Sequence, residues 1–196
     1  MQTTNNTSPS THLKTGDEHF AAGQFLEAAE QYNSALDILI ATHGDKHIDV
    51  ASTYNKIGDV CIALKDYQLA AGFYARALDT YTALLTENSM EVATTCNKVA
   101  EACHWLGAYQ TAIEFYNRAL NINLALHGNQ HPDVATIYSN LAFAHFDNQN
   151  AAQAETLMQT ALQILEIIHA GDDNHPAIKT IRQNLAFIRD SVQPKG

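Results

Sequence analysis

Small and apolar residues recur along the chain in a pattern that indicates packed helices. Four segments begin at Phe25, Tyr67, Tyr109 and Ala151, which lie 42 residues apart each time. The first three segments follow the spacing A-x3-Y-x2-A-L, and the fourth has methionine in place of the tyrosine. This spacing places all four positions on one stripe of a helix. The alanines let a neighbouring helix approach closely, and the aromatic fills the gap between them. The aromatics are Tyr32, Tyr74 and Tyr116, and Met158 replaces them in the fourth segment.

A second helix is expected before each of these segments, at the same interval. It carries a small residue near its middle, and short polar breaks ("AAGQ", "LKD", "LGA" and "DNQN") separate it from its partner helix. Two antiparallel helices per repeat, stacked copy on copy, predict an α-solenoid. The small residues are Gly16, Gly58, Ala100 and Ala142.

The order small residue, alanine, aromatic, alanine resembles the tetratricopeptide repeat. The 42-residue form with "HGNQHPDVATIYSNLA" is similar to the repeats of kinesin light chains and related bacterial proteins. Kinesin light chains also have an N-terminal heptad coiled coil and further repeats, which this sequence lacks. We therefore expect a stand-alone array of the same repeat type.

The resemblance covers residues 10–191 and implies a single all-α domain. We expect a right-handed α-solenoid of four tetratricopeptide helix pairs plus a C-terminal capping helix. Residues 1–9 and 192–196 are expected to be disordered tails. The expected repeats are 10–42, 49–84, 91–126 and 133–169, and the capping helix is 176–191.

The composition disfavours nucleic acids and membranes as partners. The formal net charge of −10 would be repelled by a phosphate backbone or an anionic lipid surface. No apolar run approaches the roughly 18–20 residues of a membrane-spanning helix, and "MQTTNNTSPSTH" at the start has no signal-peptide pattern. Three cysteines, an odd number, lie within apolar helical patterns, so we expect a reduced, cytoplasmic setting without membrane insertion.

Two linkers share a histidine pattern: "HGDKH" at 43–47 returns as "HGNQH" at 127–131. Two sets that lie two repeats apart cannot share one metal ion. In the second linker, we interpret Gly128 as a left-handed helix end and Asp133 as a cap or first-turn residue of the next helix. The histidines are therefore interpreted as joints between helices, and a metal site on them is the alternative.

Motifs for chemistry are absent from the sequence. Cys61, Cys96 and Cys103 fall where the repeat packs apolar residues, so we expect buried, inert thiols. The chain has no glycine-rich phosphate loop, no CxxC and no HExxH. We expect no enzyme, no catalytic residue, no metal and no cofactor.

The resemblance implies a concave groove lined by the first helix of each pair. Asparagines there suit an extended peptide, because one amide both donates and accepts hydrogen bonds, and lysines suit acidic side chains of a partner. Kinesin-light-chain-type grooves are similar in using asparagines for peptides with an aromatic amid acids. The expected groove residues are Lys14, Asn55, Lys56, Asn97, Lys98, Trp105, Asn140, Phe143 and Phe146.

Each groove feature also has a plainer explanation. Lys56 with Asp59, and Lys98 with Glu101, are spaced as solvated ion pairs worth only ~0.3–0.5 kcal/mol. Trp105 and Phe146 either pack against a neighbouring second helix or form an apolar floor that anchors a partner's side chain.

The function predicted from the sequence is protein–protein interaction. We expect a non-enzymatic adaptor that binds a peptide or helical segment of another protein in the groove, with the oligomeric state open. One alternative is a small acidic secretion-type chaperone, which would form a stable dimer with one dedicated partner. The alternative of another class is a metal-binding protein or enzyme that uses the linker histidines.

Overall fold

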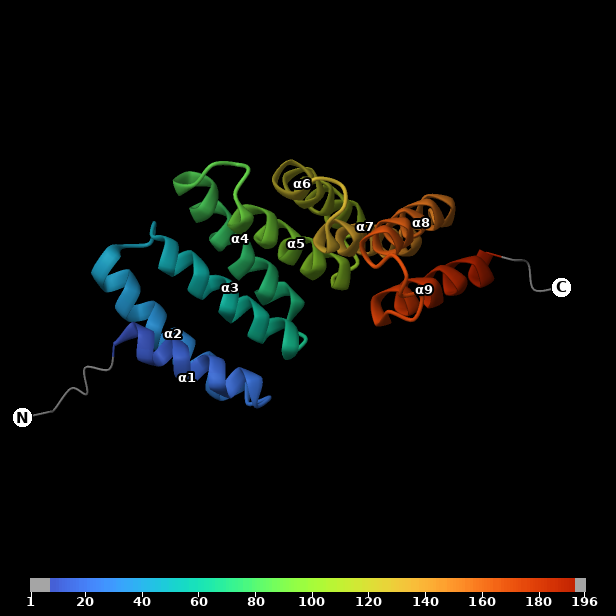
Figure 1. The fold of residues 1–196 in the computed structure, drawn as a ribbon. Helices are drawn as coiled ribbons and strands as arrows, with labels where there is room; N and C mark the ends of the chain where they lie inside the picture. The colour runs from blue at the N-terminus through green and yellow to red at the C-terminus, as the bar shows by residue number, and fades with distance from the viewer. Residues whose placement is uncertain (1–7, 193–196) are drawn as a thin grey trace, which may run out of the picture. The chain divides into compact units, whose positions relative to one another are not determined.

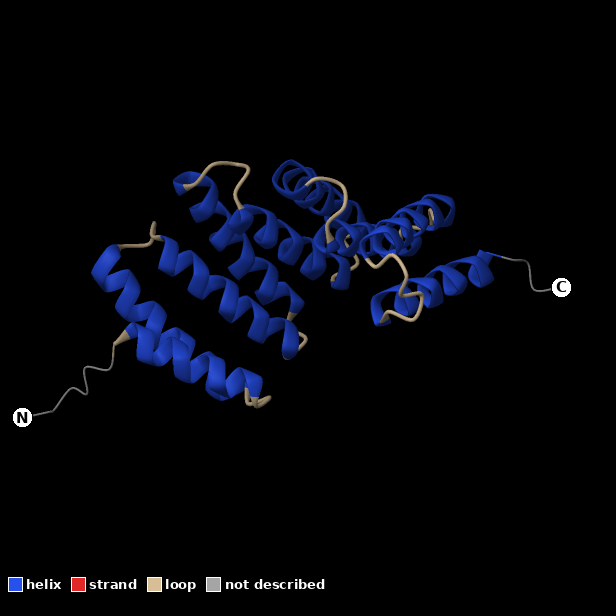
Figure 2. Cartoon of the chain, viewed as in Figure 1, coloured by secondary structure: helices blue, strands red, loops and turns tan. Residues whose placement is uncertain are grey.

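The computed structural model describes residues 8–192, which fold into helices and contain no strand (Figures 1 and 2). This confirms the all-α helical repeat fold expected from the sequence. The helices are α1 (Pro9–Ala21), α2 (Phe25–His43), α3 (Ile48–Ala63), α4 (Tyr67–Leu84), α5 (Met90–Trp105), α6 (Tyr109–His127), α7 (Pro132–Asp147), α8 (Ala151–Ile168) and α9 (Pro176–Val192).

Helix α1 begins earlier than expected. The backbone N–H of Thr11 donates to Ser8 Oγ at 3.3 Å, so Ser8 caps the helix. Pro9 suits the first turn, where its missing N–H has no helical partner to lose. The prediction that residues 8 and 9 belong to a tail is therefore wrong, and α9 also runs one residue further than expected. The rest of the predicted tails, residues 1–7 and 193–196, lies outside the described residues.

The helices form two compact units that divide between Thr86 and Glu87. In the first unit, helices adjacent in sequence pack together: α1 with α2, α2 with α3 and α3 with α4. In the second unit, α5 to α9 do the same, and α5 also contacts α7. The single domain expected over residues 10–191 stays a prediction.

The small residue of the first helix admits the aromatic ring of the second. A Cβ atom on Gly58 would lie 2.3 Å from Cε1 of Tyr74, which is far too close, so only glycine fits beneath this ring. The Tyr74 hydroxyl donates to Asp59 Oδ1 at 2.7 Å. Tyr32 makes the same two contacts in the first repeat: its ring lies over Gly16, and its hydroxyl donates to Asp17. In the first two repeats, the signature thus encodes a ring contact together with a hydrogen bond.

The alanine columns are completely buried, as expected, which lets the helices approach closely. The last helix buries an apolar face, which consists of Ile178, Ile181, Leu185 and Ile188. Because α9 packs against α8, this face covers the end of the second unit.

Candidate functional site

The candidate site lies on the second unit, where the side chains of α5 and α7 meet. A cavity of about 410 Å³ opens between these helices, and we name it the tryptophan pocket. Its lining residues are Glu101, His104, Trp105, Tyr116, Asn140, Phe143 and Asp147.

Trp105 is the most exposed part of the tryptophan pocket. It is the last residue of α5 and is 58% exposed. The His104 ring stacks nearly parallel to it, with centroids 5.9 Å apart and an angle of 14°. An exposed, flat aromatic surface of this kind is typical of a binding anchor rather than of a packed core.

Asp147 connects α7 to α5. Its Oδ2 atom lies 2.6 Å from Nε2 of His104. An ionised carboxylate can only accept, so the histidine must donate this hydrogen bond from Nε2. The bond fixes both the histidine ring and the carboxylate at the rim of the tryptophan pocket.

Two asparagines meet between cavities. Asn140 Nδ2 donates to Asn97 Oδ1 at 3.4 Å, and both residues are partly buried. Asn97 also lines a smaller cavity of about 210 Å³, whereas Asn140 lines the tryptophan pocket. At 3.4 Å the bond is long and therefore weak, which leaves both amides able to exchange it for a ligand.

The tryptophan pocket is acidic. Glu101 and Asp147 line it, and none of its lining residues is a lysine or arginine. Tyr116 forms part of the floor, and its burial, together with the charge of Glu101, raises the pKa of its hydroxyl well above the ordinary value. The hydroxyl therefore stays protonated.

The predicted lysine pairs differ from those in the structure. Lys56 donates to Asp17 Oδ1 at 2.6 Å, across to the preceding repeat, and not to Asp59 as the sequence spacing suggested. Its ammonium also lies 5.6 Å from the centroid of the Tyr32 ring. Burial raises the pKa of Asp17, but the hydrogen bonds from Lys56 and Tyr32 outweigh it and hold this pKa below its usual range.

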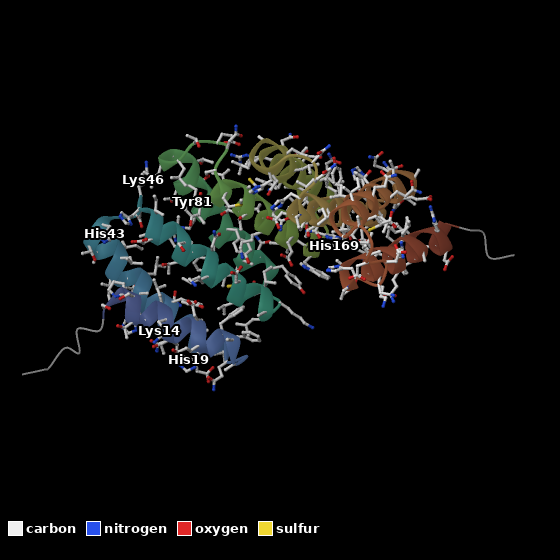
Figure 3. The ribbon with its side chains drawn as sticks, viewed as in Figure 1. Lys14, His19, His43, Lys46, Tyr81 and His169 are labelled. Carbon is white, nitrogen blue, oxygen red and sulfur yellow. The ribbon has the colours of Figure 1, made fainter. Side chains whose placement is uncertain are left out.

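The other residues predicted in the first unit contribute less to a site. Lys14 forms an exposed ion pair with Glu18 at 3.8 Å, which surface screening makes weak. Figure 3 shows Lys14 on α1. Asn55 is partly buried on α3. The two predicted lysines of the first unit, Lys14 and Lys56, thus already face acidic side chains of the chain itself.

In the second unit, four predicted residues line neighbouring cavities: Asn97, Trp105, Asn140 and Phe143. Lys98 is partly buried on α5. The Phe146 ring lies 5.5 Å from that of Phe187 on α9.

The sequence prediction missed Asp147 and left His104 out of the site. A signal was present, because the two residues are 43 positions apart, as are Asn97 and Asn140. In a 42-residue array, side chains one repeat and one residue apart face each other between successive first helices. This offset identifies these two contacts, which a single repeat does not reveal.

In each of the two linkers, the second histidine, His47 or His131, caps the helix that follows. His131 Nδ1 accepts a hydrogen bond from the backbone N–H of Asp133 at 3.2 Å, and its ring stacks on His127 at 4.1 Å. The stack recurs between His43 and His47 and between His169 and His175 (Figure 3 labels His43 and His169). The interpretation as joints is therefore supported, although the cap is the histidine and the aspartate lies in the first turn.

Loss of this cap has a measurable cost. We expect His131→Ala to lower the free energy of unfolding by about 0.5–2 kcal/mol, because the N–H of Asp133 loses its acceptor. His131→Asn should retain most of the stability, since asparagine is a good helix cap. Urea unfolding followed by circular dichroism measures both, and an equal loss in the two variants would refute the capping role.

The three thiols lie in the core, as expected. Cys61, Cys96 and Cys103 are free and buried. Burial raises the pKa of Cys61 and of Cys96 to about 11, and it raises the pKa of Cys103 as well. A raised pKa leaves little thiolate near neutral pH, so these thiols are poor nucleophiles.

None of the helices between residues 8 and 192 combines the length and apolar character needed to cross a bilayer.

A family model described as "Tetratricopeptide repeat" matches residues 11–83 and 91–167. This repeat family is generally a non-enzymatic scaffold fold. No curated protein sequence gives a significant match.

Solved structures share the fold at low sequence identity. BtubC (BKLC) from P. vanneervenii aligns with a TM-score of 0.81 and 23% identity, over 93% of this chain and 72% of that chain. A Podosopora anserina protein with nearly identical TPR-like repeats of the kinesin light chain kind aligns with a TM-score of 0.82 and 17% identity, over 93% and 85%. The Rap conjugation gene regulator of plasmid pLS20, in complex with the Phr* peptide, aligns with a TM-score of 0.70 and 19% identity, over 94% of this chain and 48% of that chain.

Proposed function

Because the chain belongs to the tetratricopeptide repeat family, we propose that it is a protein-interaction module that binds an extended segment of a partner protein across α5 and α7. The observation that carries this proposal is the Asn97–Asn140 pair, which lies between two cavities on that surface. We propose that the module acts by binding alone, as is general for the scaffold fold of its family.

The asparagine pair suits the backbone of a bound segment. Each amide presents a donor and an acceptor, so one side chain can bracket one peptide unit. The present Asn97–Asn140 bond is long, so a ligand that replaces it costs the protein little. The cavities on either side then accept alternate side chains of the segment.

A structural neighbour supports a peptide as the ligand. The pLS20 Rap regulator is described with the Phr* peptide bound. We expect this chain to use the same class of ligand, a peptide segment, although the two sequences are only 19% identical.

The proposal is tested by affinity capture from native lysate. Asn97→Ala combined with Asn140→Ala should weaken capture of a specific partner by roughly tenfold or more, because two hydrogen-bonding amides are lost. The matched control is Asn117→Ala with Asn121→Ala, which removes two exposed asparagines from α6. Equal loss in both pairs, or no loss in either, would place recognition elsewhere.

A second candidate, a metal site, has one observation in its favour. Potential ligand atoms of His127, His131 and Asp133 all lie within 4.8 Å of one another. The two rings stack at an angle of 15°, however, so both would have to turn to bring one ion into the plane of each ring. Zinc should raise the unfolding midpoint of the wild type and of His43→Ala, but not of His127→Ala, if this candidate is correct.

A further inference from the structure

The tryptophan pocket combines acids with aromatic rings. Trp105, Tyr116 and Phe143 supply the rings, and Glu101 and Asp147 supply the carboxylates. Aromatic faces attract cations, and tryptophan does so most strongly. Carboxylates attract them as well, so both kinds of lining group favour the same ligand chemistry.

Glu101 has no ion pair within the described part of the chain. Two other acids of the second unit do have one: Glu87 accepts from Arg118 at 2.7 Å, and Glu155 accepts from Arg189 at 2.7 Å. Glu101 is partly buried, where a carboxylate without a counter-charge costs more than it does in water.

The repeat itself shows which group is missing. Asp17 follows the small residue of the first repeat, and the lysine that pairs with it, Lys56, lies 39 residues later. Glu101 follows the small residue of the third repeat, and the residue 39 positions later is Asn140, which is neutral. In the tryptophan pocket, the acid of this pair is therefore retained as Glu101, but Asn140 stands in place of the lysine.

We infer that a cationic side chain of the partner, arginine or lysine, fills this place. It would lie over the Trp105 indole, with its charge between the Glu101 and Asp147 carboxylates. This inference rests on the proposed function and specifies the partner's chemistry at one position. It reverses the expectation of an acidic partner that the lysines of the first helices suggested.

The chain contains internal precedents for such a contact. The Arg76 guanidinium lies 4.2 Å from the centroid of the Tyr54 ring. Lys56 combines an aromatic ring and a carboxylate, those of Tyr32 and Asp17. Arginine fits the tryptophan pocket better than lysine does, because its planar group both stacks on an indole and donates two hydrogen bonds to one carboxylate.

Trp105 is the only tryptophan of the chain, so its fluorescence reports directly on the pocket. The probes are acetylated, amidated tripeptides Gly-X-Gly, with arginine, citrulline, leucine or glutamate as X. Citrulline has nearly the shape of arginine but no charge. We expect a saturable fluorescence change with the arginine probe, and affinity at least roughly tenfold lower for citrulline and for glutamate.

Two variants sharpen the test. Glu101→Gln removes a carboxylate that makes no hydrogen bond within residues 8–192, so the fold is retained, and it should weaken arginine binding severalfold. Asn140→Lys should abolish binding, because it restores the internal cation of the Asp17–Lys56 pair. Equal binding of arginine and citrulline, tighter binding of leucine, or no saturable change with any probe would overturn the inference.

The outcome is separable from that of the proposed function. If the arginine probe fails while partner capture still depends on Asn97 and Asn140, the module binds a partner but the cation assignment is wrong. If the probe binds but capture ignores these asparagines, the pocket is correct and the extended-segment proposal fails.

Discussion

Tyr74→Ala is expected to lower the free energy of unfolding by about 3–5 kcal/mol, which is the usual cost of removing a large buried aromatic ring. The Tyr74 side chain is 1% exposed, and its ring lies directly over Gly58. The substitution leaves a cavity between α3 and α4 and removes the donor to Asp59. Equilibrium unfolding by denaturant, followed by far-ultraviolet circular dichroism, measures the loss.

The control for this prediction is Tyr74→Phe. It keeps the ring and removes only the hydroxyl, so we expect a loss of about 0.5–1.5 kcal/mol. If the alanine variant lost no more than the phenylalanine variant, the ring contact would not be what holds these two helices together.

Gly58→Ala is expected to lower the free energy of unfolding by up to about 2 kcal/mol, although alanine favours helices by about 1 kcal/mol over glycine. The new Cβ atom would lie 2.3 Å from one carbon of the Tyr74 ring and 2.6 Å from another. That ring is buried on all sides, so it cannot move without disturbing its other contacts, and overpacking of this kind costs about 1–3 kcal/mol.

Gly72→Ala is the matched control for this second prediction. Gly72 also lies in a helix, α4, but a Cβ atom there would meet nothing within 4 Å, so this variant should gain about 1 kcal/mol. In a Tyr74→Ala background, Gly58→Ala should likewise become stabilising, because the clashing ring is gone. A stabilising Gly58→Ala in the wild type would show that the ring does not require glycine.

The helices and their core were predictable because each repeat encodes them locally. The spacing of Ala70, Tyr74 and Ala77 is a helical stripe, and its return at a fixed period shows that one surface is used again and again. The structure buries these columns completely or nearly so. Periodicity therefore predicts which residues pack, even in a single sequence.

The partners of polar side chains were less predictable, because they join different repeats. Lys56 has an acid three positions away on its own helix, yet it reaches Asp17, 39 residues back. Spacing within one helix cannot reveal such a contact, which depends on how successive first helices lie side by side. His131 illustrates a second difficulty, since imidazole is not among the favoured capping groups that a sequence pattern suggests.

The candidate site was predicted in part for the same reason. Trp105, Phe143, Asn97 and Asn140 stood out as residues off the core stripe, and the structure places them on neighbouring cavities. The charge of the tryptophan pocket did not stand out. The negative charge comes from Glu101 and Asp147, which lie on two different helices. It is not neutralised from position 140, because that residue is an asparagine and not a lysine.

The most direct test of the proposed function is photocrosslinking in native lysate. A benzophenone amino acid would replace Phe143 of α7 in one variant and Phe115 of α6 in another, each an aromatic for an aromatic at a partly buried position. We expect a discrete crosslinked partner from position 143, reduced by Asn97→Ala with Asn140→Ala, and none from position 115. A partner captured from position 115 alone, or equally from both, would contradict recognition across α5 and α7.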